Sequence, residues 1–225
     1  MQCGNDHADT EAQNGCEKKT TQLPSNGVYI QDINGKLWET EDWDNSVKPN
    51  AVAVIADEAK FLIALTQAPS TTTISSFSTA TLDKYMMAAL DSDVAKADYN
   101  GAGNTANIMK LPQRTDYAAN HCSTYILPDG NTKGYLPSLG QLNLAYQNKD
   151  AIDAALSKCG AAMFEDYYWS STFAGVNGSG RSCWILRWNG GIVSYDYVSH
   201  YYYVRPFADF VGEHFLIKKL SKNER

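Results

Sequence analysis

Residue types that could do chemistry are scattered in this chain of 225 residues. The histidines stand far apart, at positions His7, His121, His200 and His214. No metalloprotease, serine-hydrolase or phosphate-loop motif accompanies them. His121 beside Cys122 is the one suggestive pair, but neighbouring residues of a strand point to opposite faces, which would keep a base and a nucleophile apart. We therefore expect no catalytic residue and no enzymatic activity.

The five cysteines predict neither a metal site nor a disulfide framework. They are Cys3, Cys16, Cys122, Cys159 and Cys183. No two of them have the CxxC spacing of a zinc site, and an odd number fits a disulfide framework badly. We expect Cys122, Cys159 and Cys183 to be small buried apolar residues, and we expect no metal ion and no cofactor.

Residues 166–212 have a composition that is typical of a binding surface. Lys, Glu, Gln and Met are absent from this stretch, although it holds half of the 14 tyrosines. A Tyr ring offers a large contact area for only two side-chain torsions, and small polar residues adapt their hydrogen bonds around it. Lys and Glu would lose more rotamer entropy on being immobilised. An ordinary sheet edge with aromatic cross-strand pairs is the alternative interpretation.

Two sets of side chains alternate along residues 183–191, as they do on an extended chain. We expect the large apolar set to face a core and the mixed set to face outward. The apolar set is Trp184, Leu186 and Trp188, and the mixed set is Ile185, Arg187 and Asn189. The run from Ser194 to Tyr202 then has no hydrophobic period, so it would pack poorly as core.

Length and charge limit the architecture and the partners. The chain suits one large domain, for which we expect residues 25–210, and its apolar fraction is ordinary. A net charge of -6 with no basic run argues against nucleic acid as a partner. No apolar stretch approaches the roughly 20 residues that span a bilayer.

Both ends of the chain are polar. Residues 1–24 lack periodicity and predict a flexible leader or tether, and residues 211–225 predict a polar tail. The N-terminal segment has no apolar region of the kind that secretory signals carry. Cys3, followed by Gly4 and Asn5, could be the acylated start of a lipoprotein whose leader has been removed, and this stays open.

The remaining elements predict a mixture of strands and helices. Asn34-Gly35 indicates a first hairpin, and residues 51–65 indicate two buried strands around a turn at Asp57-Glu58. Residues 69–80 indicate a loop or an edge. Apolar residues at helical spacing predict a helix over 82–94, and a shorter helix is expected over 101–110. Strands are expected to fill the chain after residue 160, through 204–210.

Two further helices follow a turn at residues 128–131. Ser138 and Gln141 have the spacing of a capping box, in which each side chain bonds the other residue's backbone. The second helix is expected to open at Asp150 and to end at Gly160, where glycine tolerates a left-handed conformation.

Four segments of the chain together resemble a known family. They are 134–140 (GYLPSLG), 167–172 (YYWSST), 184–191 (WILRWNGG) and 203–207 (YVRPF). The chain resembles target proteins of diversity-generating retroelements, of the type found in gut Bacteroidales and their phages. The resemblance extends weakly back to the first hairpin. It implies an α+β, C-type-lectin-like fold with antiparallel strands, two or more packed helices and a variable segment near the C-terminus.

Such retroelements misread adenines of a template, and a randomised AAC codon cannot yield Lys, Glu, Gln, Met or Trp. The resemblance thus supplies a cause for the missing residue types. It implies ligand contacts at the variable positions Arg181, Ser182, Ile185, Arg187, Asn189, Ile192, Ser194, Tyr195, Asp196, Tyr197, Ser199, His200, Tyr201 and Tyr202. It implies a fixed framework at Trp169, Trp184, Leu186, Trp188, Gly191, Val193 and Arg205, and the status of Val198 stays open.

The function that the resemblance implies is hypervariable ligand or receptor binding, as in an adhesin. The protein would be exposed on a phage tail or a bacterial cell surface and would bind a protein or glycan of another cell. A homo-oligomer would add multivalency. The alternative is a structural or single-ligand protein without diversification. Calcium-dependent sugar recognition lacks its Glu-Pro-Asn or Gln-Pro-Asp tripeptide, and a formylglycine-making oxidase would need a close cysteine pair, of which Cys159 and Cys183 give no sign.

Overall fold

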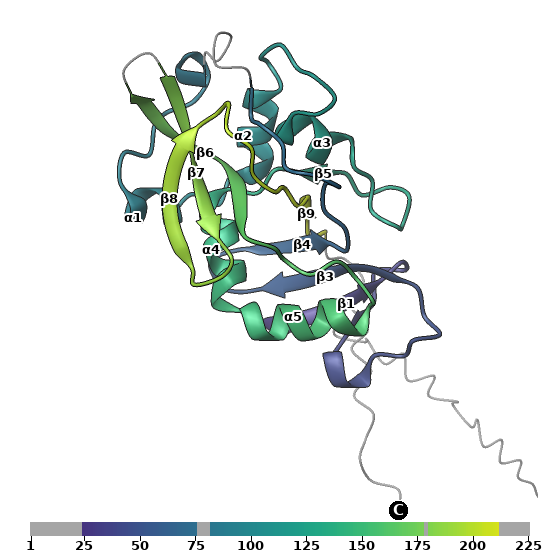
Figure 1. Ribbon diagram of the computed structural model, residues 1–225. Coiled ribbons are helices and arrows are strands. Elements are labelled where there is room, and N and C mark those ends of the chain that lie inside the picture. Colours follow the sequence, from purple (N-terminus) through teal and green to yellow (C-terminus); the bar gives the residue numbers. More distant parts are fainter. Residues whose placement is uncertain (1–23, 76–81, 178–179, 212–225) are drawn as a thin grey trace, which may run out of the picture.

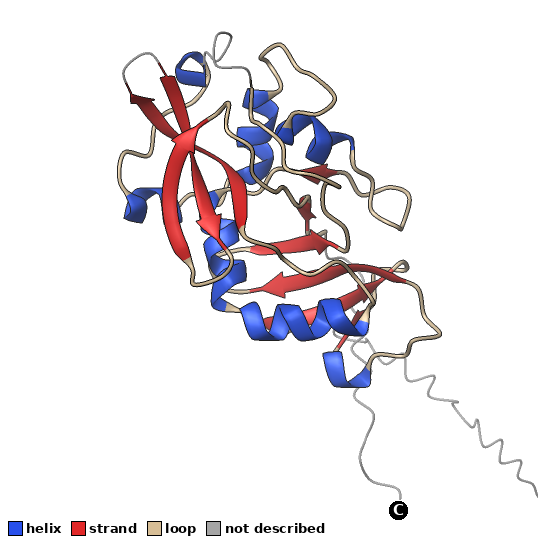
Figure 2. Cartoon of the chain, in the orientation of Figure 1, coloured by secondary structure: helices blue, strands red, loops and turns tan. Residues whose placement is uncertain are grey.

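Two antiparallel sheets and five α-helices form an α+β fold in the computed structural model, which describes residues 24–75, 82–177 and 180–211 (Figures 1 and 2). The larger sheet has the order β2-β1-β3-β4-β9-β5 and the smaller one β6-β7-β8. The strands are β1 (Gly27–Asp32), β2 (Leu37–Trp38), β3 (Pro49–Ile55), β4 (Lys60–Ala64), β5 (Gly134–Tyr135), β6 (Tyr167–Asn177), β7 (Gly180–Arg187), β8 (Ile192–Tyr197) and β9 (Phe207–Asp209). The helices are α1 (Ser92–Lys96), α2 (Gly101–Ile108), α3 (Ala118–Thr124), α4 (Leu139–Gln147) and α5 (Lys149–Lys158), with 3-10 turns η1 (Thr40–Asp42) and η2 (Leu82–Lys84).

The larger sheet confirms the two hairpins that the sequence predicts. Gly35 has a φ of +81° in the β1–β2 turn, which a side chain would strain. Strands β3 and β4 pair from Ala51 opposite Ala64 to Ile55 opposite Lys60, and almost all their residues are buried. Strand β9, the last in the sequence, lies between β4 and β5, so the larger sheet combines early and late segments of the described chain. Helix α5 packs against β1 and β3 (Figure 1).

The helical predictions after residue 100 are confirmed. Helix α2 occupies most of the expected range 101–110. At the start of α4, the Ser138 N–H donates to Gln141 Oε1 at 3.0 Å, as the capping box requires. Helix α5 begins within a residue of the expected position, and Gly160 follows its end with a φ of +61°.

The predicted helix over 82–94 is wrong. Only η2 and the start of α1 are helical there, and Leu90 and Val94 are largely exposed. Between η2 and α1 the chain has no regular secondary structure, and Ala89 binds the smaller sheet there. Its N–H donates to the Phe173 carbonyl at 2.9 Å, and its carbonyl accepts from Trp184 Nε1 at 2.9 Å. Tertiary hydrogen bonds have overridden a helical spacing of apolar residues.

Apolar clusters cover both faces of the smaller sheet. Trp184, Leu186 and Trp188 belong to a core shared with the larger sheet and α4, as the alternation predicts. The opposite face does not lie in solvent. Ile185 is 3% exposed and packs with Trp169 and Val198 in a second core.

The expectation that Ile185 faces outward is therefore wrong. The chain after β8 folds back over this face, since the Ile74 and Ser75 N–H groups both donate to the Val198 carbonyl. Ser182 is likewise buried. Alternation on one strand specifies two faces but does not reveal a loop that covers the second one.

Several smaller expectations concern the His121–Cys122 pair, the other cysteines, membrane spans and the chain ends. His121 and Cys122 lie on helix α3 and not on a strand. Cys122 and Cys183 are buried, whereas Cys159 is only half-buried. Within the described ranges, no helix is long and apolar enough to cross a membrane. Apart from Pro24 and Val211, the predicted leader and tail lie outside the described residues.

Candidate functional site

Strand β8 forms an edge of the smaller sheet (Figure 1). It carries Ile192, Ser194 and Tyr195, three exposed residues of the predicted variable segment. Its register against β7 places Ile192 opposite Arg187, Ser194 opposite Ile185 and Asp196 opposite Cys183. Directly opposed residues share a face. We call the face that bears Arg187, Ile192, Ser194 and Asp196 the Arg187 face, and the one that bears Val193, Tyr195 and Tyr197 the Tyr195 face.

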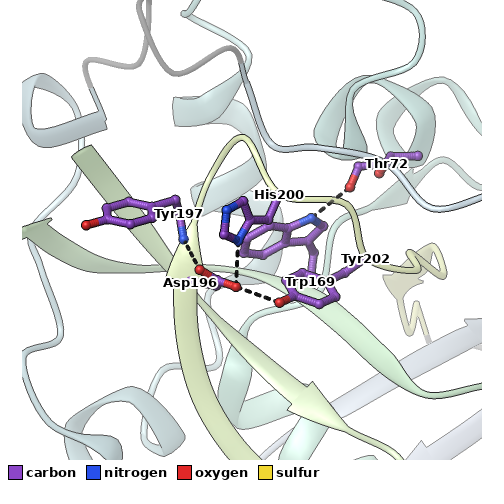
Figure 3. A network of polar contacts seen from close by, with 6 residues as sticks. All are labelled: Thr72, Trp169, Asp196, Tyr197, His200 and Tyr202. Atoms are coloured by element: carbon purple, nitrogen blue, oxygen red, sulfur yellow. Dashed lines mark hydrogen bonds and ion pairs between the residues drawn. The ribbon is translucent and has the colours of Figure 1, made fainter. Parts of the chain in front are cut away.

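Asp196 is the centre of a polar network on the Arg187 face (Figure 3). Its Oδ2 accepts from the Tyr202 hydroxyl at 2.5 Å and lies 2.7 Å from His200 Nδ1. Its Oδ1 accepts from the Tyr197 N–H at 2.7 Å. Burial by itself would raise the pKa of the Asp196 carboxyl, but the hydrogen bonds from Tyr202 and His200 hold this pKa below its ordinary value.

The ring of Tyr202 rests on two other aromatic residues. It meets Trp169 edge-on, with 5.0 Å between ring centroids, and lies 5.6 Å from Tyr167. Trp169 is fully buried and donates from Nε1 to the Thr72 carbonyl at 2.8 Å (Figure 3). Burial, followed by the hydrogen bond to Asp196, raises the pKa of Tyr202. The buried tryptophan thus holds an interacting tyrosine and carboxylate at the surface.

Arg187 forms a second cluster on the same face. Its Nε lies 2.8 Å from Asp166 Oδ1, and its guanidinium lies 5.4 Å from the centroid of the Tyr167 ring. The hydrogen bond to Asp166 raises the pKa of Arg187. Sequence reasoning did not select Asp166 or Tyr167 as site residues. The register of β6 against β7, which sets Tyr167 opposite Arg187, is the information that would have found them.

The Tyr195 face has a different neighbourhood. The Tyr195 side chain is 51% exposed and packs edge-on against Trp184, with 5.4 Å between ring centroids. The Ala89 carbonyl accepts a hydrogen bond from Nε1 of the same Trp184. The segment around Ala89 also borders an open pocket of about 440 Å³, whose apolar lining includes Met86 and Phe173. A helix was expected in this segment, so the pocket was not foreseen.

The structure separates the predicted site residues into groups. Four of them lie on the Arg187 face, namely Arg187, Ile192, Ser194 and Asp196. Two more, His200 and Tyr202, contact this face through Asp196. Tyr195 and Tyr197 lie on the other face, and Arg181 pairs with Asp83 at 2.9 Å. Asn189 is exposed in the β7–β8 turn, and Ser199 and Tyr201 follow β8. Ser182 and Ile185 are buried, so neither side chain is available to a ligand in this structure.

The expected framework residues are buried or packed. Trp169, Trp184, Leu186, Trp188 and Arg205 are each at most 5% exposed. Val198, whose status the sequence left open, is fully buried in the second core and packs as framework.

Arg205 ties separate segments together inside the molecule. Its Nη2 donates to the carbonyls of Ala162 at 2.6 Å and Met163 at 3.0 Å, and its guanidinium lies 4.1 Å from the Phe164 ring centroid. Burial lowers its pKa to about 10. The guanidinium therefore remains charged at neutral pH while it holds the loop that precedes β6.

The three cysteines within the described residues show no feature of reactive thiols. Burial raises the pKa of both Cys122 and Cys183, and it raises that of Cys159 to about 11. A raised pKa disfavours the nucleophilic thiolate. Within the described part of the chain, no group of three or more His, Cys, Asp or Glu side chains is placed to hold a metal ion.

Comparison of the chain with protein-family models, curated proteins and solved structures finds no match in any of the three. The chemistry of the site therefore has to be interpreted from its own geometry. The exposed sheet edge carries aromatic rings, small hydroxyl side chains and two clusters of charged side chains, around Asp196 and Arg187. Such a surface can bind a ligand by shape, stacking and hydrogen bonds.

Proposed function

We propose that this protein is a hypervariable ligand-binding protein of adhesin type, whose C-terminal surface is diversified by a retroelement on a C-type-lectin-like scaffold. The observation that carries the proposal is the division of residues on the smaller sheet. All but two of the predicted variable side chains are at least partly exposed, whereas the predicted tryptophan and arginine framework is buried. Exchange at the exposed positions would then leave the cores intact.

The composition of the surface supports binding over a purely structural role. Tyr195 and Tyr201 are each more than half exposed, so two aromatic side chains with large contact areas are accessible to a partner. Tyr202 is instead held in place by Asp196 and Trp169, so part of the surface is ordered before a ligand arrives. Pre-ordered aromatic groups lose little entropy on binding. The partner that fits the proposal is a protein or glycan on the surface of another cell.

Cell binding tests the proposal. Fluorescently labelled full-length protein would be mixed with a panel of intact gut Bacteroidales strains and measured by flow cytometry. The test variant replaces Arg187, Ile192, Tyr195 and Tyr201 with Ser, a residue that diversified positions tolerate. The matched control replaces the exposed Lys158 and Ile126, which lie on α5 and in the loop after α3, with Ser.

The expected result is labelling of particular strains, its loss in the test variant and its retention in the control, with both variants folded at the assay temperature in thermal melting. The substitutions remove contacts but no core side chain. Labelling of no strain, or equal labelling by both variants, contradicts the proposal and favours a structural component without diversification.

A further inference from the structure

Strand β8 is a long edge with open backbone hydrogen-bonding groups. The edges of the larger sheet, β2 and β5, have two residues each, and such short edges offer little to a partner. Strand β8 has six residues and contains neither Lys nor Pro, the residues that commonly protect an edge. It is therefore the edge on which another strand could pair.

The opposite edge of the same sheet is closed by the chain itself. Along β6, the Trp169 N–H donates to the Tyr203 carbonyl, and the Ser171 N–H donates to the Pro137 carbonyl at 2.7 Å. Further along, the Phe173 carbonyl accepts from Ala89. Three separate segments thus bind outer backbone groups of β6, whereas no strand pairs with the outer edge of β8 within the described residues.

The backbone N–H and C=O groups of β8 point alternately toward β7 and away from it, which shows which of them lack a partner in the sheet. The Val198 N–H donates to the Arg181 carbonyl, so the even-numbered residues of β8 face β7 and the odd-numbered ones face away. Tyr197 is already engaged, since its N–H donates to Asp196 and its carbonyl accepts from the His200 N–H. Within the described residues, the N–H and C=O groups of Val193 and Tyr195 have no such partner.

The split of the variable positions between two faces points to what occupies this edge. Ile192, Ser194 and Asp196 lie on the Arg187 face, whereas Tyr195 and Tyr197 lie on the other. A ligand lying flat on one face could not touch both sets. A strand added at the edge would place its alternate side chains beside each set in turn.

We infer that β8 binds its ligand by strand addition, and that the ligand contacts this edge through an extended segment of a protein. This rests on the proposed function, because it takes the variable positions as contact positions. Two donors and two acceptors spaced as in a strand match a polypeptide backbone and not a sugar or a nucleic acid. The net charge of -6 opposes a second copy of this chain as the occupant and favours a neutral or basic segment.

The main chain supplies affinity in such a complex, and the side chains supply selectivity. This arrangement suits a diversified protein, because the backbone of β8 stays the same when its side chains change. Exchange at Ser194 or Tyr195 would alter which segment is preferred without removing the hydrogen bonds that any extended segment can form.

Proline at an outward-facing position tests the inference. The probe is a displayed library of random dodecapeptides, selected for binding to the full-length protein. Val193→Pro removes an N–H that points away from β7, whereas Val193→Thr retains it. Selected peptides should lose affinity on the order of tenfold with V193P, as expected for a lost edge hydrogen bond with its neighbours. They should keep their affinity for V193T.

Amide hydrogen exchange on the unmodified protein gives an independent result if V193P folds poorly. Bound peptide should slow exchange at Val193 and Tyr195 more than at Tyr197, whose amide is already bonded. Failure to select any peptide, equal binding of V193P and V193T, no slowing at these two amides, or a dimer of the protein alone through β8 each overturns the inference. If V193P retains strain-specific cell labelling that the serine variant loses, the proposed function stands and strand addition falls.

Discussion

Trp184 and Tyr195 pack against each other, but at the residue scale they should contribute very differently to stability. Trp184 is 5% exposed and donates to the Ala89 carbonyl, whereas Tyr195 is half exposed. We expect Trp184→Ala to lower the free energy of unfolding by about 3–5 kcal/mol, as for an emptied aromatic core site. Tyr195→Ala should lower it by about 1 kcal/mol or less. Urea unfolding of both variants measures the difference, and equal losses would contradict the division into framework and surface.

Asp196 should contribute to stability in a way that depends on pH. Its pKa is below the ordinary value, so the unfolded chain takes up the proton more readily than the folded one. The stabilisation is complete above about pH 4, the ordinary pKa of an aspartate, and is lost as the pH falls through the lower, folded value.

Asp196→Asn provides the comparison, because it removes the titrating group and keeps its size. The difference in unfolding free energy between the original protein and D196N should be largest near neutral pH and should shrink below about pH 4. Chemical denaturation at several pH values measures it. A difference that stays constant down to pH 3 would show that the hydrogen bonds of Asp196 do not stabilise its charged form.

At the element scale, the β7–β8 turn positions the edge strand through two adjacent glycines that differ in their surroundings. Both have positive φ, +99° at Gly190 and +65° at Gly191. A Cβ at Gly190 meets nothing, whereas one at Gly191 would lie 2.2 Å from the ring of Tyr146 on α4. The turn therefore approaches the helix too closely for any side chain at Gly191.

Alanine at each position should separate backbone strain from the steric clash. Gly190→Ala should cost about 1 kcal/mol of stability through its φ alone. Gly191→Ala should cost about 2 kcal/mol more, because the Tyr146 ring must move. Thermal melting of the two variants measures this, and equal melting temperatures would mean that the hairpin can shift away from α4 freely.

Local signals predicted the elements that local chemistry determines. The Asn34-Gly35 turn, the capping box at Ser138 and the stop at Gly160 were all foreseen, because each depends on residues close in sequence. The helix over 82–94 was predicted wrongly, since Ala89 donates to the Phe173 carbonyl and accepts from Trp184 Nε1, and both partners lie more than eighty positions away. Sequence periodicity contains no information about such partners.

The site was predicted in its composition but only partly in its geometry. The buried set on β7 agrees with the alternation predicted for residues 183–191. The exposure of Ser194 and Tyr195 on β8 agrees with the absence of a hydrophobic period after residue 194. The burial of Ile185 could not be foreseen, because it depends on a loop that returns over the sheet near Val198. Asp166 and Tyr167 were missed because their role comes from strand register and not from their own sequence context.

At the scale of the whole molecule, the smaller sheet lies between two apolar cores, and its β8 edge has no strand partner among the described residues. The first core joins this sheet to the larger one, and the second joins it to α3 and to the chain after β8. We expect the described domain to unfold in a single transition monitored by both tryptophan fluorescence and circular dichroism. Two separate transitions would mean that the smaller sheet is not held by the shared core.

The most direct test of diversification is sequencing of the coding region for residues 166–205 across a growing host population, together with the flanking DNA. The account predicts a near-copy of this region nearby, and substitutions that match adenines in that copy. They should fall at exposed positions such as Arg187, Ser194 and Tyr195 and should spare Trp169 and Trp184. A uniform gene with no copy nearby would contradict the account and would make the tyrosine-rich edge a fixed surface.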